Sequence, residues 1–173
     1  MQHTLIALLL DRPGALNRAV SLFRRRAFNI DSLSVATTET PGLSRMTVVV
    51  PREDVTQVAR QLERLLDVIE VRDVTREHVV VHELCLVRLR HPGAHLGDLL
   101  RAARDGDAHV VEATADAVVV AIMGSPPAVS RCLDRLQPFG ILELTRSGRI
   151  VMPASGSAGR VNAFGANRGE SAA

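Results

Sequence analysis

The sequence predicts an α+β protein made of two tandem ferredoxin-like units, each with the order strand, helix, strand, strand, helix, strand. Two observations carry this prediction: strand-like and helix-like hydrophobic periods follow one another in that order in the first half of the chain, and the order recurs in the second half. With 173 residues, 46% of them hydrophobic, the chain can bury a core in each unit. The predicted units cover 1–78 and 79–152.

The first three elements are predicted from their periodicity. Residues 3–10 form a short apolar run that suits a buried strand. The helix 15–26 follows, because Leu16, Ala19 and Phe23 recur at helical spacing. Residues 31–38 then alternate between apolar and polar side chains, which is typical of a half-buried strand.

The unit is completed by a strand at 45–50, a helix at 53–66 and a strand at 68–74. The helix is expected to begin with an acidic turn and to place Leu65 and Leu66 on its apolar face. Glu63, Asp67 and Glu70 have the spacing of a solvated helix end. In the second half, the predicted strands are 83–90, 109–114, 118–123 and 141–145, and the predicted helices are 96–104 and 127–136.

Short identities accompany the repeated order. Leu62-Glu-Arg-Leu65 corresponds to Leu133-Asp-Arg-Leu136, and Pro13-Gly-Ala15 corresponds to Pro92-Gly-Ala94. Because matches this short arise by chance, the repeat depends mainly on element order. After Pro153 the composition changes to Ala, Gly, Ser and Asn, so 153–173 is predicted to be a disordered tail.

Composition excludes several classes of protein. The formal net charge is only +2, and there is no Trp or Tyr, which argues against a nucleic-acid partner and against an RNA-recognition sheet. No apolar run approaches ~18 residues, so we expect no membrane span and a soluble cytoplasmic protein. Cys85 and Cys132 lack metal-site spacing and are predicted to be buried thiols. His78 and His82, or His91 and His95, are four residues apart but lie on no convincing helix, so no metal site is predicted.

The loop Asp11-Arg-Pro-Gly-Ala-Leu16 is the main candidate site. It joins an apolar strand to a helix, whose first N–H groups lack backbone partners and favour an anion. Asp11 and Asn29 are expected on two nearby turns, where they could bind an ammonium group, so the loop could hold a free amino acid. The simpler interpretation is a tight turn at Pro13-Gly14, with Asn29 as a cap or turn residue.

These motifs resemble a known family. The first half is similar to an ACT domain, and the ordered run Asp11–Leu16, Phe28-Asn-Ile-Asp-Ser-Leu33 and Ser44-Arg-Met-Thr47 resembles the small regulatory subunit of acetolactate synthase. The resemblance continues through Leu66-Asp-Val68, Pro138-Phe-Gly-Ile141 and Arg146-Ser-Gly148, and so covers roughly residues 3–150.

The resemblance implies a regulatory protein without catalysis of its own. Such subunits bind and activate the catalytic large subunit, which carries thiamine diphosphate, Mg and FAD. They also make branched-chain amino acid synthesis sensitive to valine or a related amino acid. Two ACT domains pair side by side in a homodimer, and the second unit would serve dimerisation or large-subunit contact.

By the same resemblance, the effector lies at the interface between the two ACT domains. The residues that would line the site are Asp11, Gly14, Ala15, Leu16, Asn29 and Ile30. Many relatives have Asn at Asp11, so Asp11 is assigned to the effector ammonium, and Ala27 replaces a usual Gly. Two alternatives stay open: a stand-alone ACT module that regulates a different enzyme or a transcription factor, and an independent enzyme, for which no motif is visible.

Overall fold

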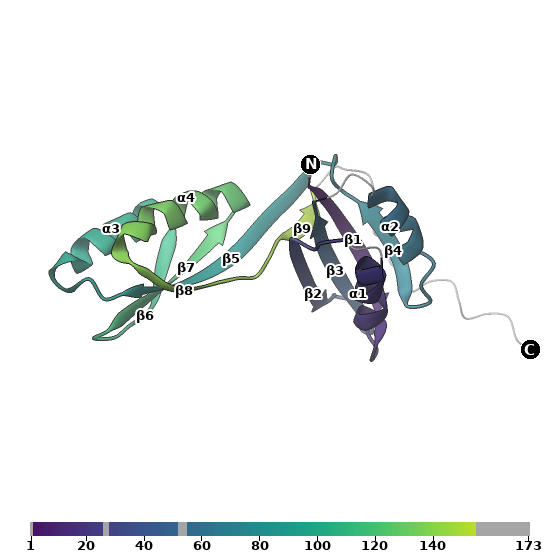
Figure 1. Cartoon of the computed structure of the whole chain (residues 1–173), viewed down its shortest axis with the longest axis horizontal. Coiled ribbons are helices and arrows are strands. Elements are labelled where there is room, and N and C mark those ends of the chain that lie inside the picture. The colour runs from purple at the N-terminus through teal and green to yellow at the C-terminus, as the bar shows by residue number, and fades with distance from the viewer. Residues whose placement is uncertain (1, 26–27, 52–54, 155–173) are drawn as a thin grey trace, which may run out of the picture.

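The computed structural model describes residues 2–25, 28–51 and 55–154. These residues form two lobes arranged side by side, each a sheet with two helices on one face (Figure 1). The long strand β5 (Val79–Arg90) runs from the first lobe into the second (Figure 1). Within this part of the chain, no helix is long and apolar enough to cross a membrane.

The first lobe holds a four-stranded sheet in the order β2-β3-β1-β4, in which all pairs are antiparallel. Its elements are β1 (His3–Leu10), α1 (Ala15–Arg25), β2 (Ser32–Thr37), β3 (Leu43–Val50), α2 (Val55–Leu62) and β4 (Val68–Asp73).

The second lobe repeats this topology, with the sheet order β6-β7-β5-β8. After β5 its elements are α3 (Leu96–Asp105), β6 (Ala108–Ala113), β7 (Ala117–Gly124), α4 (Pro126–Leu136) and β8 (Ile141–Arg146), with single-turn helices η1 (Gly93–His95) and η2 (Gln137–Phe139). Strand β5 takes the central place that β1 has in the first lobe, because it pairs with both β7 and β8. The prediction of two tandem βαββαβ units is therefore confirmed.

Each lobe has its own core between its sheet and its helices. Alternate residues of the central strands face the helices and are buried, Leu5, Ala7 and Leu9 on β1 and Cys85, Val87 and Leu89 on β5. Cys132 of α4 lies in the second core, and both cysteines are free thiols, as predicted. Burial raises the pKa of the Cys85 and Cys132 thiols.

Helix α2 is shorter than the predicted helix 53–66. It ends at Leu62, after which Leu65 donates its N–H to the Leu62 carbonyl at 3.0 Å in a tight turn. Leu65 still packs against the core, whereas Leu66 is 92% exposed, so its predicted place on the apolar face is wrong. The turn redirects the chain and brings Asp67 inward. The predicted acidic first turn falls on 52–54, outside the described residues.

A ninth strand, β9 (Ile150–Pro153), was not predicted from the sequence. It pairs with the first part of β5, from Val79 to His82, and β5 therefore begins four residues before the predicted strand at 83. Pro153, which was assigned to the disordered tail, is the last residue of β9, and Ala154 donates its N–H to His78 O at 3.0 Å. The rest of the predicted tail, 155–173, lies outside the described residues.

Candidate functional site

The loop between β1 and α1 is a tight turn at one end of the first sheet. Asp11 donates its N–H to Gly42 O at 2.8 Å, and Ala15 donates its N–H to Arg12 O at 3.2 Å. Gly14 has φ +85°, a conformation that favours glycine. Asp11, Gly14 and Leu16 are exposed and Ala15 is buried. Since the Ala15 N–H is bonded within the turn, it is not the free anion donor that the sequence suggested.

A buried carboxylate, that of Asp67, forms ion pairs with arginines of this loop and of α1. Asp67, between α2 and β4, has a side chain only 3% exposed, and both of its oxygens are bound by arginines. Arg12 Nε lies 2.6 Å from Oδ1, Arg18 Nε binds Oδ2, and Leu10 donates its N–H to Asp67 O at 2.8 Å. The prediction that Asp67 belongs to a solvated helix end is therefore wrong.

These partners also set the charge of Asp67. The hydrogen bond from Arg18 and the guanidinium of Arg12 lower the pKa of the Asp67 carboxyl below its usual value, although burial acts in the opposite direction. At neutral pH the carboxylate is ionised. It therefore holds two cations at the start of α1, where the helix dipole alone would favour an anion.

Arg18 lies directly against Gly14. Its Nη1 atom is 2.9 Å from the position that a β-carbon on Gly14 would occupy, and its Cζ is 3.6 Å away. The resemblance stated from the sequence implies that Gly14 lines the effector site. In the structure, the space beside Gly14 holds the guanidinium group of Arg18, which requires a residue without a side chain.

Asn29 and Ile30 lie at the opposite end of the sheet from this loop. The next residue, Asp31, donates its N–H to Val49 O at 2.9 Å and accepts a hydrogen bond from Gln2 Nε2 at 2.8 Å. Val49 and Gly42, the anchor of Asp11, are separated by the length of β3, roughly 20 Å at ~3.3 Å per residue. Asp11 and Asn29 were expected on two nearby turns. Within one chain they lie at opposite ends of the sheet, so this expectation is wrong.

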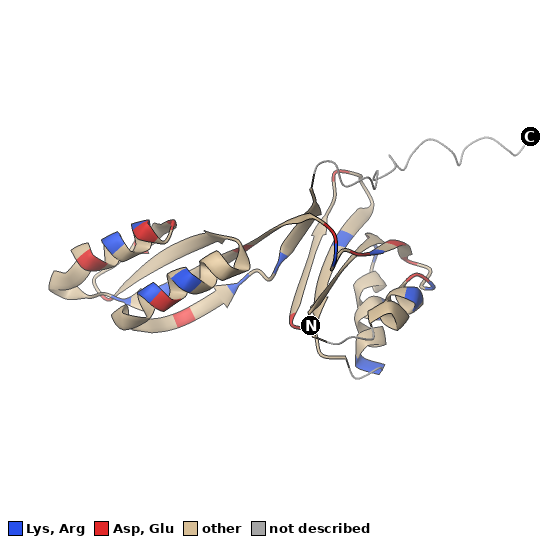
Figure 2. Ribbon diagram, turned by 90° about the horizontal axis from the view of Figure 1, so that it is seen from above, with Lys and Arg blue, Asp and Glu red and all other residues tan. Residues whose placement is uncertain are grey.

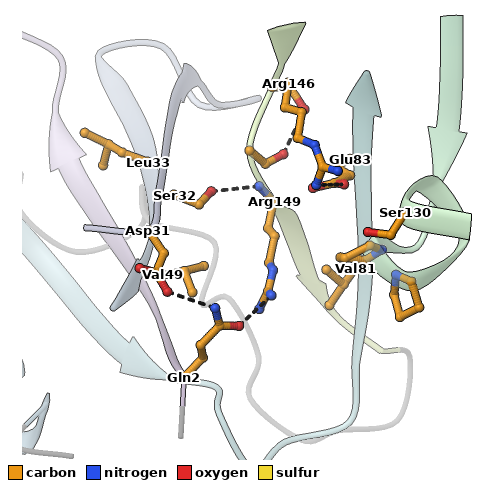
Figure 3. A pocket seen from close by; sticks show the side chains of 14 residues that line it. Gln2, Asp31, Ser32, Leu33, Val49, Val81, Glu83, Ser130, Arg146 and Arg149 are labelled. Carbon is orange, nitrogen blue, oxygen red and sulfur yellow. Dashed lines mark hydrogen bonds and ion pairs between the residues drawn. The ribbon is translucent and has the colours of Figure 1, made fainter. Parts of the chain in front are cut away.

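The turn at Asp31 borders a cleft of about 820 Å³ between the two lobes (Figure 3). Arg149 crosses it, donating its backbone N–H to Ser32 Oγ at 2.9 Å and its Nη2 to Gln2 Oε1 at 2.6 Å. On the other side, the buried Glu83 accepts a hydrogen bond from Arg146 Nη1 at 3.1 Å. The strand that follows Asn29 and Ile30 is thus bonded to the segment that leads from β8 of the second lobe back to β9.

Among the other residues that the structure describes, no buried carboxylate is bound by two arginines. Basic and acidic residues are interspersed along the two helices of the second lobe (Figure 2). Among the described residues, no three His, Cys, Asp or Glu side chains are grouped so that they could hold a metal ion. Arg12, Arg18 and Asp67 form the charged cluster at the loop, and the sequence analysis did not predict it. The available signal was Arg18, a cation in the first turn of a helix.

The βαββαβ topology of the first lobe, with its glycine turn between β1 and α1, is that of a protein with an ACT-type domain. A family profile described as an AHAS small subunit-like ACT domain matches residues 5–70, and one described as the small subunit of acetolactate synthase matches 82–155. The chain belongs to the family of acetolactate synthase small subunits, which are the regulatory part of the holoenzyme and not catalytic alone. The resemblance stated from the sequence is confirmed.

The chain matches individual relatives over almost their whole length. The chain is 40% identical over 154 residues to a probable acetolactate synthase small subunit of Archaeoglobus fulgidus, covering 88% of this chain and 96% of the relative. It is 37% identical over 150 residues to the acetolactate synthase small subunit of Mycolicibacterium smegmatis, covering 86% and 88%. The crystal structure of the Thermotoga maritima small subunit superposes with a TM-score of 0.81 at 25% identity, covering 89% of this chain and 98% of that one.

Proposed function

We propose that this chain binds the large, thiamine-diphosphate-dependent subunit of acetolactate synthase, raises its activity, and makes it sensitive to valine or another branched-chain amino acid. The observation that carries the proposal is the loop Asp11–Leu16, where Arg18 lies against Gly14 and both Arg12 and Arg18 are bound to Asp67. The chain is related to small subunits over nearly its full length. The protein would act in the cytoplasm, in valine, leucine and isoleucine biosynthesis. Thiamine diphosphate, Mg and FAD would belong to the large subunit.

The effector site would be completed by a second copy of the chain. Strand β2 is an edge of the first sheet, and its residues Val35, Ala36 and Thr37 are exposed. An antiparallel pair of β2 strands would join two sheets edge to edge and place the start of one β2 beside the end of the other. Asn29 and Ile30 of one chain would then face the Asp11–Leu16 loop of the second.

The residues of this site suit a zwitterionic amino acid. The α-carboxylate would bind at the start of α1, where the dipole and the arginines favour an anion. Asp11, which is exposed at the start of the loop, would accept the ammonium group. Leu16 and Ile30 would provide apolar walls for a branched side chain. One methylene more or less in such a wall changes binding by ~1–3 kcal/mol, so valine, leucine and isoleucine must be compared directly.

The route from this site to the large subunit would pass through the junction of the lobes. Ser32 follows Asn29 and Ile30 by two or three residues and accepts the Arg149 N–H at 2.9 Å. An effector that binds one dimer arrangement more tightly than another shifts the population between them. The large subunit would respond to the extent that its own binding differs between those arrangements.

Reconstitution tests this function. The full chain and a purified large subunit are mixed, association is measured by size-exclusion chromatography, and turnover is followed with a panel of free amino acids. We expect a stable complex, a higher rate, and inhibition by at least one branched-chain amino acid. If the chain binds an amino acid but neither associates with the large subunit nor changes its rate, it is a stand-alone ACT module for a different target.

A further inference from the structure

We propose that Arg18 binds the carboxylate of the amino-acid effector, and that Asp67 is the positioning residue that holds Arg18 and Arg12 in place for it. This inference rests on the proposed function, since it assigns a role within the same effector site.

The orientation of Arg18 supports the first part. Its Nε is bonded to Asp67, while Nη1 and Nη2 lie 2.9 and 3.8 Å from the position of a β-carbon on Gly14. The side chain is 51% exposed, and within the described part of the chain its Nη atoms have no acceptor. A guanidinium held at Nε presents its two terminal groups as a fork, which matches the geometry of a carboxylate.

The charge of the cluster supports an anionic ligand. Two guanidinium groups surround one carboxylate, which leaves one positive charge without a counter-ion among the three side chains. That charge lies in the first turn of α1, where a cation is unfavourable unless an anion accompanies it. Asp67 compensates one arginine, and the effector carboxylate would compensate the other.

The placement of Asp67 makes it a suitable anchor. Its backbone O accepts the Leu10 N–H at 2.8 Å, so the residue is fixed to the end of β1 immediately before the loop. Its side-chain oxygens take one arginine from the loop and one from α1. The loop and the helix start are therefore held to the same buried residue.

The second lobe shows that the βαββαβ fold does not require this cluster. Its equivalent turn contains Gly93, which also has positive φ, +57°, but nothing lies within 4 Å of a β-carbon at that position. The residue four places later, where the first lobe has Arg18, is Gly97. The first turn of α3 carries an acid, Asp98, as the dipole favours. The arginine pair thus belongs to the lobe that carries the proposed effector site.

Calorimetry on the full chain with the large subunit tests the assignment, using L-valine and L-valinamide, which lacks the carboxylate. We expect Arg18→Gln to weaken valine binding about 10- to 100-fold, as for loss of a charge-assisted hydrogen bond, and to leave the weaker valinamide binding unchanged. Arg18→Lys should recover part of the loss, and Asp67→Asn should weaken valine binding about 10-fold with the same insensitivity of valinamide.

The matched controls are Arg101→Gln and Asp98→Asn, which change an exposed ion pair on α3. Neither substitution should affect the binding of valine or valinamide. The inference is overturned, and the proposed function stands, if wild type binds valine and the Arg18 variants bind it equally well. The same holds if the Arg18 variants lose valinamide binding to the same extent as valine binding. If wild type associates with the large subunit but binds no branched-chain amino acid, the inference also fails. If wild type does neither, the proposed function fails with it.

Discussion

The guanidinium of Arg18 occupies the space that a side chain at Gly14 would fill, with Nη1 2.9 Å from the position of the missing β-carbon. The absence of a side chain at Gly14 therefore has two consequences. It adopts φ +85° in the turn, and it leaves room for a cation at the start of α1. Any side chain at this position must displace Arg18 or bind it.

A carboxylate at this position is expected to bind Arg18. Gly14→Asp would give an internal ion pair where the effector carboxylate is proposed to bind, so the reconstituted enzyme should remain active and lose inhibition by valine. The measurement is turnover against valine concentration. Gly93→Asp, at the equivalent turn of the second lobe with open space around it, is the control for backbone strain and should keep inhibition. Normal inhibition of the Gly14→Asp enzyme would contradict the site assignment.

Gly148 makes a close contact between the lobes. It has φ +75°, and an added β-carbon would overlap Ser32 Oγ, which accepts the Arg149 N–H. We expect Gly148→Ala to lower the free energy of unfolding by about 2 kcal/mol, roughly half from the left-handed backbone and half from the lost hydrogen bond. Gly42→Ala, with φ +80° and nothing within 4 Å, should cost only about 1 kcal/mol. Equal losses in urea titrations would show that the Ser32 contact contributes nothing.

Gly106, after α3, packs against a buried thiol. A β-carbon there would lie 2.5 Å from Cys132 Sγ, although the backbone itself is unstrained at φ −103°. Gly106→Ala should therefore destabilise the second lobe by about 1–3 kcal/mol through overpacking. The double variant with Cys132→Ala should be more stable than Gly106→Ala alone, as measured by thermal unfolding. Gly97→Ala, in open space within α3, should be neutral or slightly stabilising.

Protonation of Asp67 in acid should weaken the ion pairs that hold the loop and lower the stability of the fold. Its pKa in the folded chain is below the ordinary value of 3.8, so its contribution to stability is complete above that pH and is lost as the pH falls through the lowered pKa. Between neutral pH and about pH 5, we expect this group to leave the urea midpoint of wild type nearly unchanged. At pH values lower than about 4, the urea midpoint should decrease. Asp67→Asn should lose this contribution at neutral pH, so its midpoint should approach that of wild type in acid. A constant difference between the two proteins across this range would contradict the assignment.

Local patterns were sufficient for most of the architecture. The run of apolar residues at 3–10 and the helical spacing of Leu16, Ala19 and Phe23 place β1 and α1 within a residue of the structure. Repetition of the element order then predicted the second lobe. These features depend on neighbours in sequence, because an amphipathic element must present its apolar side to a core whichever chain segment completes it.

The errors fall where distant segments meet. Strand β9 is four residues long and forms because its partner is the extension of β5, about 70 residues earlier in the chain. Leu66 has the spacing of a buried helical residue but lies outside, since the chain turns after Leu62 to bring Asp67 inward. Neither a pairing partner nor a buried acceptor can be recognised from local periodicity.

By itself, the sequence determined the two βαββαβ units, the two buried thiols and the resemblance to acetolactate synthase small subunits, because motifs and periodicity are local properties. Only the tertiary structure placed Asp67 beneath Arg12 and Arg18 and separated Asn29 and Ile30 from the Asp11 loop. The reason is physical: an ion pair depends on where three chain segments pack together, and the distance between two turns depends on the length and register of the strand between them.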